Sequence, residues 1–440
     1  MTPAARIAAA VALLEAVEAT PQRPADATAN DFFRARRYIG SGDRRAVAER
    51  AWGVVRQRLR LEWWLRRTAP GGQPTPRRLL AAHLLLAEGW NWRGVEEAFP
   101  GGRFNAEPLD AAERAALKPL AGAPPVHPEM PEHVRLNLPE WVLPAFRDRF
   151  GDRLAEEAAA MERPAPLDLR ANLLRTTREA AAASLAAEGI ATEPTPFSPW
   201  GLRLRQRRPI TGTAAFREGL VEVQDEGSQL IALLADARPG MRVADFCAGA
   251  GGKTLAMAAT MRNKGRLVAC DVSAVRLEGA VRRLRRAGVD NAERHLLEPG
   301  DRWGKRRQAG FDRVLVDAPC TGTGTWRRNP DARLRTGPGD LAELSGKQGK
   351  ILDSAADLVR PGGRLVYATC SILPEEDEGQ MDAFLGRRPD YAPVPLAALW
   401  PALCPGVPSP ETDSSGPYLV TSPGRHGTDG FFAAVLERQG

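Results

Sequence analysis

Two cysteines in polar loops are the residues of this sequence that point most directly to covalent chemistry. Cys320 lies in DAPCTGTG and Cys370 lies in YATCS, and each follows an apolar run of the kind that forms a buried strand. A thiolate is a strong nucleophile, and covalent attack divides one difficult reaction into easier steps. Asp317 adds a carboxyl group at the end of the strand before Cys320. We therefore expect Cys320, Cys370 and Asp317 to face one cleft.

A glycine-rich turn followed by an aspartate predicts a site for a nucleoside-containing ligand. DFCAGAGGKT, residues 245–254, leads from a strand into a helix. Glycines let the backbone approach a ligand, and the helix N-terminus offers free N–H groups. The loop matches neither the dinucleotide nor the P-loop pattern, and a plain tight turn is the alternative reading. Asp271 ends the next strand, where an acidic side chain holds ribose hydroxyls or caps the helix that begins near Ser273.

The elements that must position these residues alternate between strands and helices from Asp225 onward. MRVADF, GRLVACD, FDRVLVD and GGRLVYAT each start with an apolar strand. Such alternation predicts a parallel sheet with helices on both faces. Because open α/β folds bind ligands at the carboxyl ends of their strands, the residues described above belong to one edge.

The first third of the chain predicts helices. The first twenty residues have the apolar content of a signal peptide, but Glu15 and Glu18 interrupt the run, so we expect an amphipathic helix. Further helices are expected over 43–67, 77–88 and 108–118. We expect the tryptophans of this region to lie in the core rather than to stack on bases; they are Trp52, Trp63, Trp64, Trp90 and Trp92.

Two further stretches suggest boundaries. Residues 120–133 contain four prolines and are the best linker candidate. Residues 165–222 read as strand, helix and strand, which predicts a small α/β module.

Composition limits the classes of protein that the chain can belong to. The apolar share of 43% and the charged share of 26% exclude wholesale disorder. No run reaches the roughly 20 apolar residues of a membrane helix. Five cysteines are no disulfide framework, so we expect reduced thiols and a cytoplasmic protein. The absence of a CxxC pair or a nearby histidine predicts no metal site. A net charge of +7 permits a polyanionic partner.

Five motifs together resemble those of the RsmB/NOP/Sun family of RNA cytosine-5 methyltransferases: CAGAGGKT, DAPCTGTG, RRNPD, YATCSILPEED and GTDGFF. The resemblance covers about residues 165–440, and the N-terminal helices look like the NusB-like domain of bacterial members. It implies S-adenosylmethionine as the methyl donor and Cys370 as the nucleophile. It further implies that Cys320 assists release of the methylated product and that Asp317 lies beside the methyl group and the base.

The resemblance also implies a cofactor site. Asp271 would hold the ribose, and Arg276 would belong to the same site. Glu298 in HLLEPGD, rather than Asp301, would take the place of the aspartate that reads adenine. The loop residues that would wrap the methionine portion and the ribose are Cys247, Ala248, Gly249, Ala250, Gly251, Gly252 and Lys253, and Asp317 would also contact the cofactor. Ala250 replaces the usual proline, so we expect a looser loop; the role of Lys253 stays open.

Cytosine-5 methylation explains why two thiols and an acid are needed. Carbon 5 of cytosine is a poor nucleophile, and a thiolate that adds to carbon 6 makes carbon 5 able to attack a methyl group. Asp317, if protonated or hydrogen-bonded, would stabilise the nitrogen side of the ring.

Four arginines are the expected RNA contacts. Arg203 and Arg205 alternate along GLRLRQRR, for which a solvated basic strand is an equal alternative. Arg327 and Arg328 follow Trp326 just beyond Cys320, and arginine pairs with phosphate while an aromatic ring stacks on a base.

The predicted fold class is an α/β Rossmann-like class I methyltransferase domain with a mostly parallel, doubly wound sheet. A small α/β, ferredoxin-like RNA-binding module and an all-α NusB-like domain precede it. The expected boundaries are 1–125 for the helical domain, 126–164 for linker and helices, 165–224 for the small module and 225–440 for the methyltransferase domain.

The predicted activity is methyl transfer from S-adenosylmethionine to cytosine C5 in RNA, with small-subunit ribosomal RNA as the first substrate and a monomer as the working form. Transfer RNA is an alternative substrate. A DNA cytosine-5 methyltransferase would use the Pro-Cys thiol at Cys320 and would not need Cys370. A binding protein, such as a NusB-like assembly factor that lost activity, is the alternative from another class.

Overall fold

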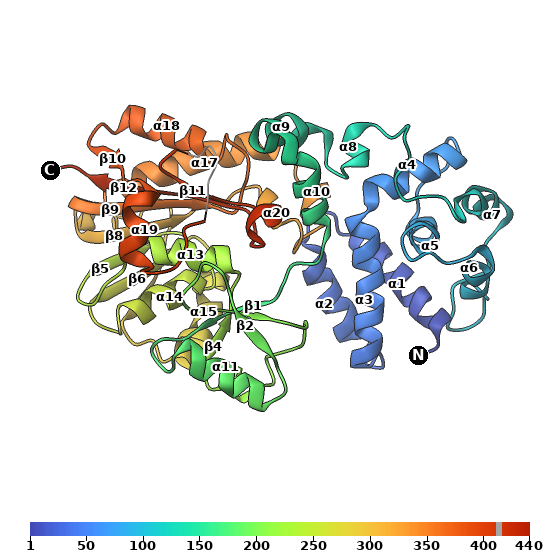
Figure 1. Cartoon of the computed structure of the whole chain (residues 1–440), viewed down its shortest axis with the longest axis horizontal. Helices are drawn as coiled ribbons and strands as arrows, with labels where there is room; N and C mark the ends of the chain where they lie inside the picture. Colours follow the sequence, from blue (N-terminus) through green and yellow to red (C-terminus); the bar gives the residue numbers. More distant parts are fainter. Residues whose placement is uncertain (411–415) are drawn as a thin grey trace. The chain divides into compact units, whose positions relative to one another are not determined.

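The computed structural model describes residues 1–410 and 416–440, which form two compact units (Figure 1). The helical unit comprises Met1–Arg163 and Trp326–Gly337. The α/β unit comprises Pro164–Thr325 and Pro338–Gly440. The short segment Trp326–Gly337 therefore leaves the α/β unit just after the Cys320 loop and belongs to the helical unit.

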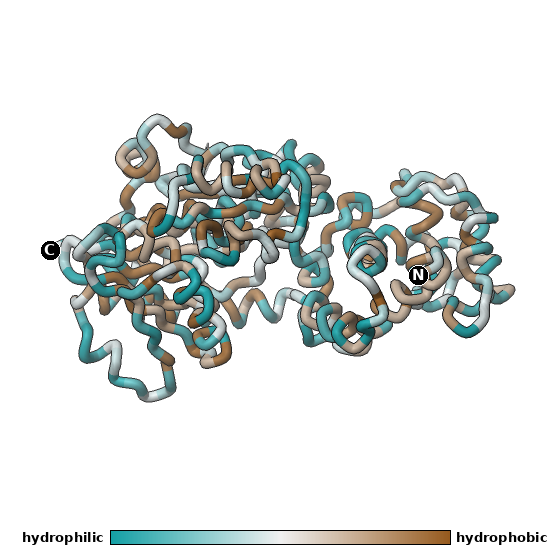
Figure 2. The backbone as a smooth tube through the Cα atoms, turned by 90° about the horizontal axis from the view of Figure 1, so that it is seen from below, coloured by the Kyte–Doolittle hydropathy of each residue, from teal (hydrophilic) through white to brown (hydrophobic). Residues whose placement is uncertain are grey.

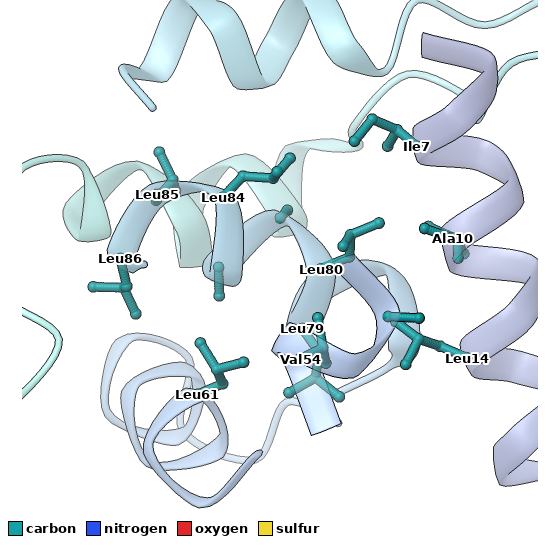
Figure 3. Close-up of a cluster of buried hydrophobic side chains, with 14 of the residues drawn as sticks. Ile7, Ala10, Leu14, Val54, Leu61, Leu79, Leu80, Leu84, Leu85 and Leu86 are labelled. Carbon is teal, nitrogen blue, oxygen red and sulfur yellow. The ribbon is translucent and has the colours of Figure 1, made fainter. Parts of the chain in front are cut away.

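The helical unit is built around apolar helix faces. Its helices are α1 (Pro3–Glu18), α2 (Ala25–Ala35), α3 (Ser41–Arg56), α4 (Arg58–Thr68), α5 (Pro76–Leu86), α6 (Trp92–Ala98), α7 (Ala111–Leu117), α8 (Glu132–Arg135), α9 (Leu143–Phe150), α10 (Leu154–Glu162) and α16 (Ala332–Arg335). The last eight residues of α5 are all buried, so this helix forms the centre of the core. Figure 3 shows Leu79, Leu80 and Leu84 of α5 between side chains of α1 and its other neighbours.

The structure corrects two predictions for this unit. The helix predicted over 43–67 is broken at Gln57, where α3 ends and α4 begins. The proline-rich stretch 120–133 is no free linker, because Leu120 and Met130 are buried in the helical core. The expectation that the five tryptophans belong to the core is confirmed: Trp64 is buried there, and Trp52, Trp63, Trp90 and Trp92 pack against it.

A small antiparallel sheet begins the α/β unit. Its strands are β1 (Asp168–Ala171), β2 (Thr192–Pro194), β3 (Gly201–Leu204) and β4 (Val221–Val223), in the order β2-β3-β1-β4. Helices α11 (Arg178–Ala187) and α12 (Ala214–Arg217) connect them. Leu169, Leu202 and Val221 of the sheet form a core with Leu185 of α11.

The large sheet has the order β10-β12-β9-β8-β5-β6-β7, with β11 paired to β12. Its strands are β5 (Arg242–Asp245), β6 (Arg266–Asp271), β7 (Ala292–Leu296), β8 (Phe311–Asp317), β9 (Val359–Thr369), β10 (Tyr391–Pro393), β11 (Leu419–Thr421) and β12 (Phe431–Arg438). The run from β7 to β9 is parallel, and β12 and β10 add antiparallel pairings. The predicted doubly wound, mostly parallel sheet is confirmed.

Helices cover both faces of the large sheet (Figure 1), and neighbouring side chains of its strands belong to different cores. Val243 belongs to a core with α13 (Glu226–Leu234), α14 (Gly252–Thr260) and α19 (Leu396–Leu403), whereas its neighbour Ala244 faces the other side. That side is covered by α17 (Pro338–Ala356) and α18 (Glu378–Arg387). The remaining helices are α15 (Ala274–Ala287), packed on α14, and α20 (Pro423–His426). Val243 and Ala244 face opposite sides because the side chains of a strand alternate with a period of two residues.

The strand order reverses at β5, which lies between β6 on one side and β8 on the other. The helix after β5 covers one face, and the helix after β8 covers the opposite face. The connections therefore diverge and leave a crevice at the carboxyl edge, where such sheets bind ligands. The glycine loop follows β5, and the Cys320 loop follows β8.

Hydrophobic stretches of chain occur in both units (Figure 2). Within residues 1–410 and 416–440, no helix combines the length and the apolar character needed to cross a membrane.

Arg203 of β3 forms an internal ion pair and is not part of a solvated surface. Its guanidinium donates to both carboxylate oxygens of Asp168 in β1, at 2.7 and 2.8 Å, and the Asp168 side chain is fully buried. Burial lowers the pKa of Arg203, but the hydrogen bond and the charge of Asp168 outweigh it and raise the pKa overall. This observation favours the structural role of Arg203 over the expected RNA contact.

We predict that Arg203→Ala lowers the free energy of unfolding by about 3 kcal/mol, because it leaves a buried carboxylate without its partner. Arg205→Ala is the matched control: this side chain is 65% exposed, so the change should stay within about 0.5 kcal/mol. Urea unfolding midpoints of the full chain test both. Equal midpoints, with loss of RNA affinity in Arg203→Ala alone, would contradict the structural role.

Candidate active site

The glycine loop after β5 is held by the carboxylate at the end of β6. Gly249 and Gly251 have φ angles of +55° and +78°, a conformation that glycine adopts without strain. Oxygen Oδ2 of Asp271 accepts the Gly249 amide at 2.8 Å, and Oδ1 accepts the Ser273 amide at 2.8 Å. Asp271 therefore fixes the loop and also orders the turn before α15.

Ala250, the departure from the usual proline, is held from outside the loop. Its carbonyl oxygen accepts a hydrogen bond from Arg283 of α15 at 2.7 Å. Arg283 also lies 3.5 Å from Glu222 of β4. The expected loosening is thus opposed by the hydrogen bond from Arg283.

A partly buried ion pair spans the point where the strand order reverses. Nζ of Lys253, in the first turn of α14, donates to Oδ2 of Asp317 at 2.5 Å. Burial lowers the pKa of Lys253, but the charge of Asp317 and its hydrogen bond outweigh burial and raise the pKa overall. Lys253 is therefore protonated, and Asp317 is hydrogen-bonded. The structure gives Lys253, whose role the sequence left open, a direct contact with Asp317.

The two cysteines of the polar loops meet at the same edge. Sγ of Cys320 and Sγ of Cys370 lie 3.4 Å apart. The pKa of Cys320 is raised well above its usual value, first by the hydrogen bond with Cys370 and then by burial. Cys320 thus keeps its proton, and either thiol can donate the hydrogen bond between the two sulfur atoms. Cys270 and Cys404 lie in the hydrophobic cores and are buried.

A buried polar network that sequence reasoning missed supports the Cys320 loop. The Glu376 carboxylate accepts the Thr321 amide at 2.9 Å and also the Thr321 hydroxyl. Gln348 of α17 donates to Glu376 at 3.0 Å and to the carbonyl of Pro319 at 2.9 Å. Glu376 belongs to the PEED run, in which both Glu376 and Asp377 are completely buried.

Two glycines let the Cys320 loop and the start of β12 pass backbone against backbone. The Gly324 amide donates to the Cys370 carbonyl at 3.0 Å, and the Gly324 carbonyl accepts the Gly430 amide at 2.9 Å. A Cβ atom on Gly324 would lie 2.1 Å from the Gly430 oxygen. This close approach explains the glycines of DAPCTGTG and GTDGFF.

Carboxyl groups gather beneath the glycine loop. Asp245 is fully buried, and its Oδ2 accepts the Thr254 hydroxyl at 2.6 Å. Burial raises its pKa to about 7, and the charges of Asp317 and Asp271 contribute in the same direction. Burial, followed by these carboxylates, also raises the pKa of Cys247. Lys253 is the cation that opposes them.

The residues expected to bind adenosine surround the ends of β6 and β7. Glu298 is exposed in the loop after β7, and Arg276 is exposed in the first turn of α15. Asp301 is engaged elsewhere, since its carboxylate contacts His295 at 2.5 Å and accepts the Trp303 amide at 2.8 Å. An apolar residue that the sequence did not single out, Val272, follows Asp271 and is 78% exposed.

The expected RNA residues have different environments. Trp326 is completely buried and Arg327 is 5% exposed, so in this structure neither offers a surface to RNA. Arg328 is half-buried, and Arg205 is exposed beyond the end of β3. Of the two arginines expected to bind RNA beyond Cys320, only Arg328 therefore remains a candidate.

Comparison with known proteins places this geometry in a family. The model of the 16S rRNA methyltransferase RsmB/F domain matches residues 232–437, and that of the RsmF/B-like ferredoxin-like domain matches residues 138–211. Ribosomal RNA small subunit methyltransferase B of Salmonella newport is 30% identical over 416 residues, which cover 90% of this chain and 91% of that protein. The chain belongs to the RsmB/F methyltransferase family.

Other relatives agree with this membership. The Thermus thermophilus protein of the same name is 36% identical over 350 residues, or 78% of this chain and 74% of that protein. Among solved structures, a methyltransferase homolog from Pyrococcus horikoshii is 30% identical, with a TM-score of 0.60 over 70% of this chain and 97% of its own. The crystal structure of PH0851 matches all of this chain and 99% of its own with a TM-score of 0.78; at 24% identity it shows the fold alone.

Members of this family are S-adenosylmethionine-dependent methyltransferases, and the residues of the crevice fit that cofactor. S-Adenosylmethionine carries a sulfonium and an ammonium cation, and the crevice gathers three carboxyl groups against one lysine. Oδ1 of Asp245 is buried and has no hydrogen-bond partner among the described residues. Gly249 borders open space, since a Cβ atom built on it would meet nothing within 4 Å.

The raised pKa of Asp245 predicts a pH-dependent loss of stability. Between the unfolded pKa of about 4 and the folded value of about 7, the folded chain binds the extra proton, so stability falls as pH rises. Asp245→Asn keeps an acceptor for Thr254 but does not titrate. Urea unfolding from pH 5 to pH 8 should therefore show the variant gaining stability relative to the wild type as pH rises.

Asp312→Asn is the control for this measurement. Although burial opposes it, the hydrogen bond from the Arg242 amide and the ion pair with Arg360 lower the pKa of Asp312. That contribution is lost only as pH falls below about 4. Its difference from the wild type should stay constant from pH 5 to pH 8. A constant difference for Asp245→Asn as well would show that Asp245 is ionised throughout.

The close approach at Gly324 predicts that Gly324→Ala separates the two loops. We expect at least a tenfold loss of methyl transfer and a loss of about 1–3 kcal/mol in stability, because the added methyl group overfills the contact. Gly346→Ala, inside α17 with open space around its Cβ position, should instead be stabilising by about 0.5–1 kcal/mol. Unfolding midpoints and initial rates compare the two; equal behaviour would refute the steric explanation.

Proposed function

We propose that this protein transfers a methyl group from S-adenosylmethionine to carbon 5 of a cytosine in small-subunit ribosomal RNA, through a covalent bond between Cys370 and carbon 6. The observation that supports this chemistry most strongly is the pair of sulfur atoms 3.4 Å apart at the ligand-binding edge of the sheet. The ribosomal substrate is supported by the names of the relatives, which are small-subunit rRNA methyltransferases.

Cys370 begins the reaction in this proposal. The Cys320 thiol holds its proton and donates a hydrogen bond toward the Cys370 sulfur, which favours negative charge on that sulfur. The Cys370 thiolate adds to carbon 6 of the ring, and carbon 5 becomes nucleophilic. S-Adenosylmethionine, when bound, supplies the methyl group that carbon 5 takes.

The Lys253–Asp317 pair serves the nitrogen side of the base. Charge develops there when the thiolate adds, and a hydrogen-bonded acid stabilises it. Because Lys253 stays protonated, it is the donor, and Asp317 orients it through the 2.5 Å hydrogen bond. This assignment uses the expected alternative in which Asp317 is hydrogen-bonded.

Cys320 takes part in product release. After methylation the proton on carbon 5 leaves to water, its bonding electrons restore the double bond to carbon 6, and the bond to the Cys370 sulfur breaks. The Cys320 thiol lies beside the departing sulfur and donates a hydrogen bond to the thiolate that forms. Without Cys320, the covalent adduct should therefore persist.

The proposed cofactor contacts follow the crevice from β5 to β8. Asp271 presents its carboxylate to the ribose, and Glu298 takes the adenine in preference to the engaged Asp301. Val272 supplies an apolar surface beside the adenine. The other proposed contacts are Cys247, Ala248, Gly249, Ala250, Gly251, Gly252, Lys253, Arg276 and Asp317. Arg205 and Arg328 are the arginines that we propose for RNA phosphates.

The decisive experiment incubates the full chain with tritiated S-adenosylmethionine and unmodified small-subunit ribosomal RNA. The wild type should label carbon 5 of cytosine. Cys370→Ala should abolish the label, since the nucleophile is missing. Cys320→Ala should accumulate an RNA adduct that resists denaturation. Cys404→Ala, which removes a core thiol outside the site, is the matched control and should keep turnover.

Each other outcome selects a different function. An adduct in Cys370→Ala but not in Cys320→Ala would make Cys320 the nucleophile, as in DNA cytosine-5 methyltransferases. Label in transfer RNA alone would keep the chemistry and change the substrate. Tight RNA binding with no label in any RNA would favour a non-catalytic assembly factor.

A further inference from the structure

A segment of twelve residues that follows the Cys320 loop is built into the helical unit. The chain passes from the α/β unit to the helical unit between Thr325 and Trp326, and it returns between Gly337 and Pro338. A third crossing joins Arg163 to Pro164. One of these three covalent joints therefore lies five residues after Cys320.

Trp326 anchors the start of the segment. Its side chain is completely buried, and its ring lies 5.7 Å from the ring of Phe146 in α9. The guanidinium of Arg333, which lies in α16, is over the same indole, 5.4 Å from the ring centroid. A buried tryptophan in this setting contributes both apolar area and ring contacts.

Arg333 anchors the end of the segment. It is 2% exposed and donates to the carbonyl oxygen of Asn137 at 2.8 Å. It also reaches the carbonyls of Arg56, at the end of α3, and Met161, in the last turn of α10. Burial lowers its pKa to about 10, which leaves it charged at neutral pH. A cation among such carbonyls is favourable because helix C-termini carry partial negative charge.

Asp331 adds a third anchor. Its Oδ2 accepts the Ala25 amide, at the start of α2, at 3.0 Å. The residue before α2, Pro24, provides no side-chain cap, so Asp331 takes that role from 306 positions away in sequence. Asp331 is also paired with Arg335 at 2.9 Å.

The residues just before the joint are equally fixed in the α/β unit. The Gly324 amide donates to the Cys370 carbonyl, and the Thr325 hydroxyl donates to the Gly322 carbonyl at 2.9 Å. The hydrogen-bonded turn of residues 322–325, beside both cysteines, is therefore joined by one peptide bond to Trp326, which is packed in the helical unit.

We propose that the helical unit positions the catalytic thiols through this segment, with Trp326 as the positioning residue and Phe146 as its partner. Any displacement of the Trp326 anchor is transmitted along the chain to residues 322–325, and from there to the Cys370 carbonyl and the Cys320 loop. The proposal rests on the proposed function for its catalytic consequence. The packing itself is independent of that function.

The test compares Trp326→Ala with the wild type in the full chain by two measurements. Iodoacetamide alkylation, followed by peptide mass spectrometry, reports the reactivity of Cys320 and Cys370 without any methyl transfer. Single-turnover methylation at saturating RNA and cofactor reports the chemical step. We expect at least a threefold change in thiol reactivity and a tenfold slower single turnover, while the dissociation constant of the cofactor changes less than twofold.

Three variants separate positioning from stability. Phe146→Ala removes the partner far from the catalytic loop in sequence and should reproduce both effects, and the double variant should be no worse than either single one. Leu80→Ala destabilises the same unit from the core of α5 and should leave thiol reactivity unchanged. Trp326→Phe keeps a ring and should retain at least a third of the rate. If Trp326→Ala does not fold, Phe146→Leu takes its place in both measurements.

The outcomes distinguish the two proposals. Altered thiol reactivity without methylation of any RNA would support positioning and overturn the proposed function. Unchanged thiol reactivity in a Trp326→Ala protein that folds would overturn positioning. Equal effects of Leu80→Ala and Trp326→Ala would also overturn it, since general loss of stability would then account for both.

Discussion

The ion pair between Lys253 and Asp317 is the interaction on which the site depends. It joins the first turn of α14 to the end of β8, two elements that the reversed strand order would otherwise leave on either side of an open crevice. Lys253 is almost completely buried, so removing its partner would leave a desolvated charge, which costs far more than an exposed one. The same pair sets the electrostatics of its surroundings, because Lys253 partly offsets the carboxylates that raise the pKa of Asp245.

A second constraint is the density of backbone and polar packing around the thiols. The Cys320 loop can meet the start of β12 only where neither chain carries a Cβ atom, at Gly324 and Gly430. Glu376 then satisfies the amide and hydroxyl of Thr321, and Gln348 satisfies Glu376 in turn. Hydrogen bonds in a buried network of this kind restrict the geometry of the groups that they join. A separation of 3.4 Å between two sulfur atoms needs such support, because both sit on loops.

The path of the chain links these loops to the helical unit. Residues 326–337 follow the Cys320 loop in sequence, yet they belong to the helical unit, where Trp326 packs against Phe146 and Asp331 caps α2. These residues therefore join the helical unit covalently to the loop that carries Cys320.

Local rules explain what the sequence by itself determined. The two-residue period of strands, the 3.6-residue period of helices and the glycine-rich turn are properties of neighbouring residues, so the doubly wound sheet and the edge that carries Asp271, Asp317, Cys320 and Cys370 were predictable. The resemblance of the motifs added the family and its cofactor.

Only the tertiary structure decided which polar groups meet. Arg203 reads as a surface charge until Asp168 on the neighbouring strand binds it. Trp326 and Asp331 follow the Cys320 loop closely in sequence. In the structure, however, Trp326 packs against Phe146 of α9, and Asp331 accepts the amide at the start of α2. The partners lie 35 to 306 positions away in sequence. The energy of a buried charge or ring depends on these distant neighbours, and a local pattern of residues holds no information about them.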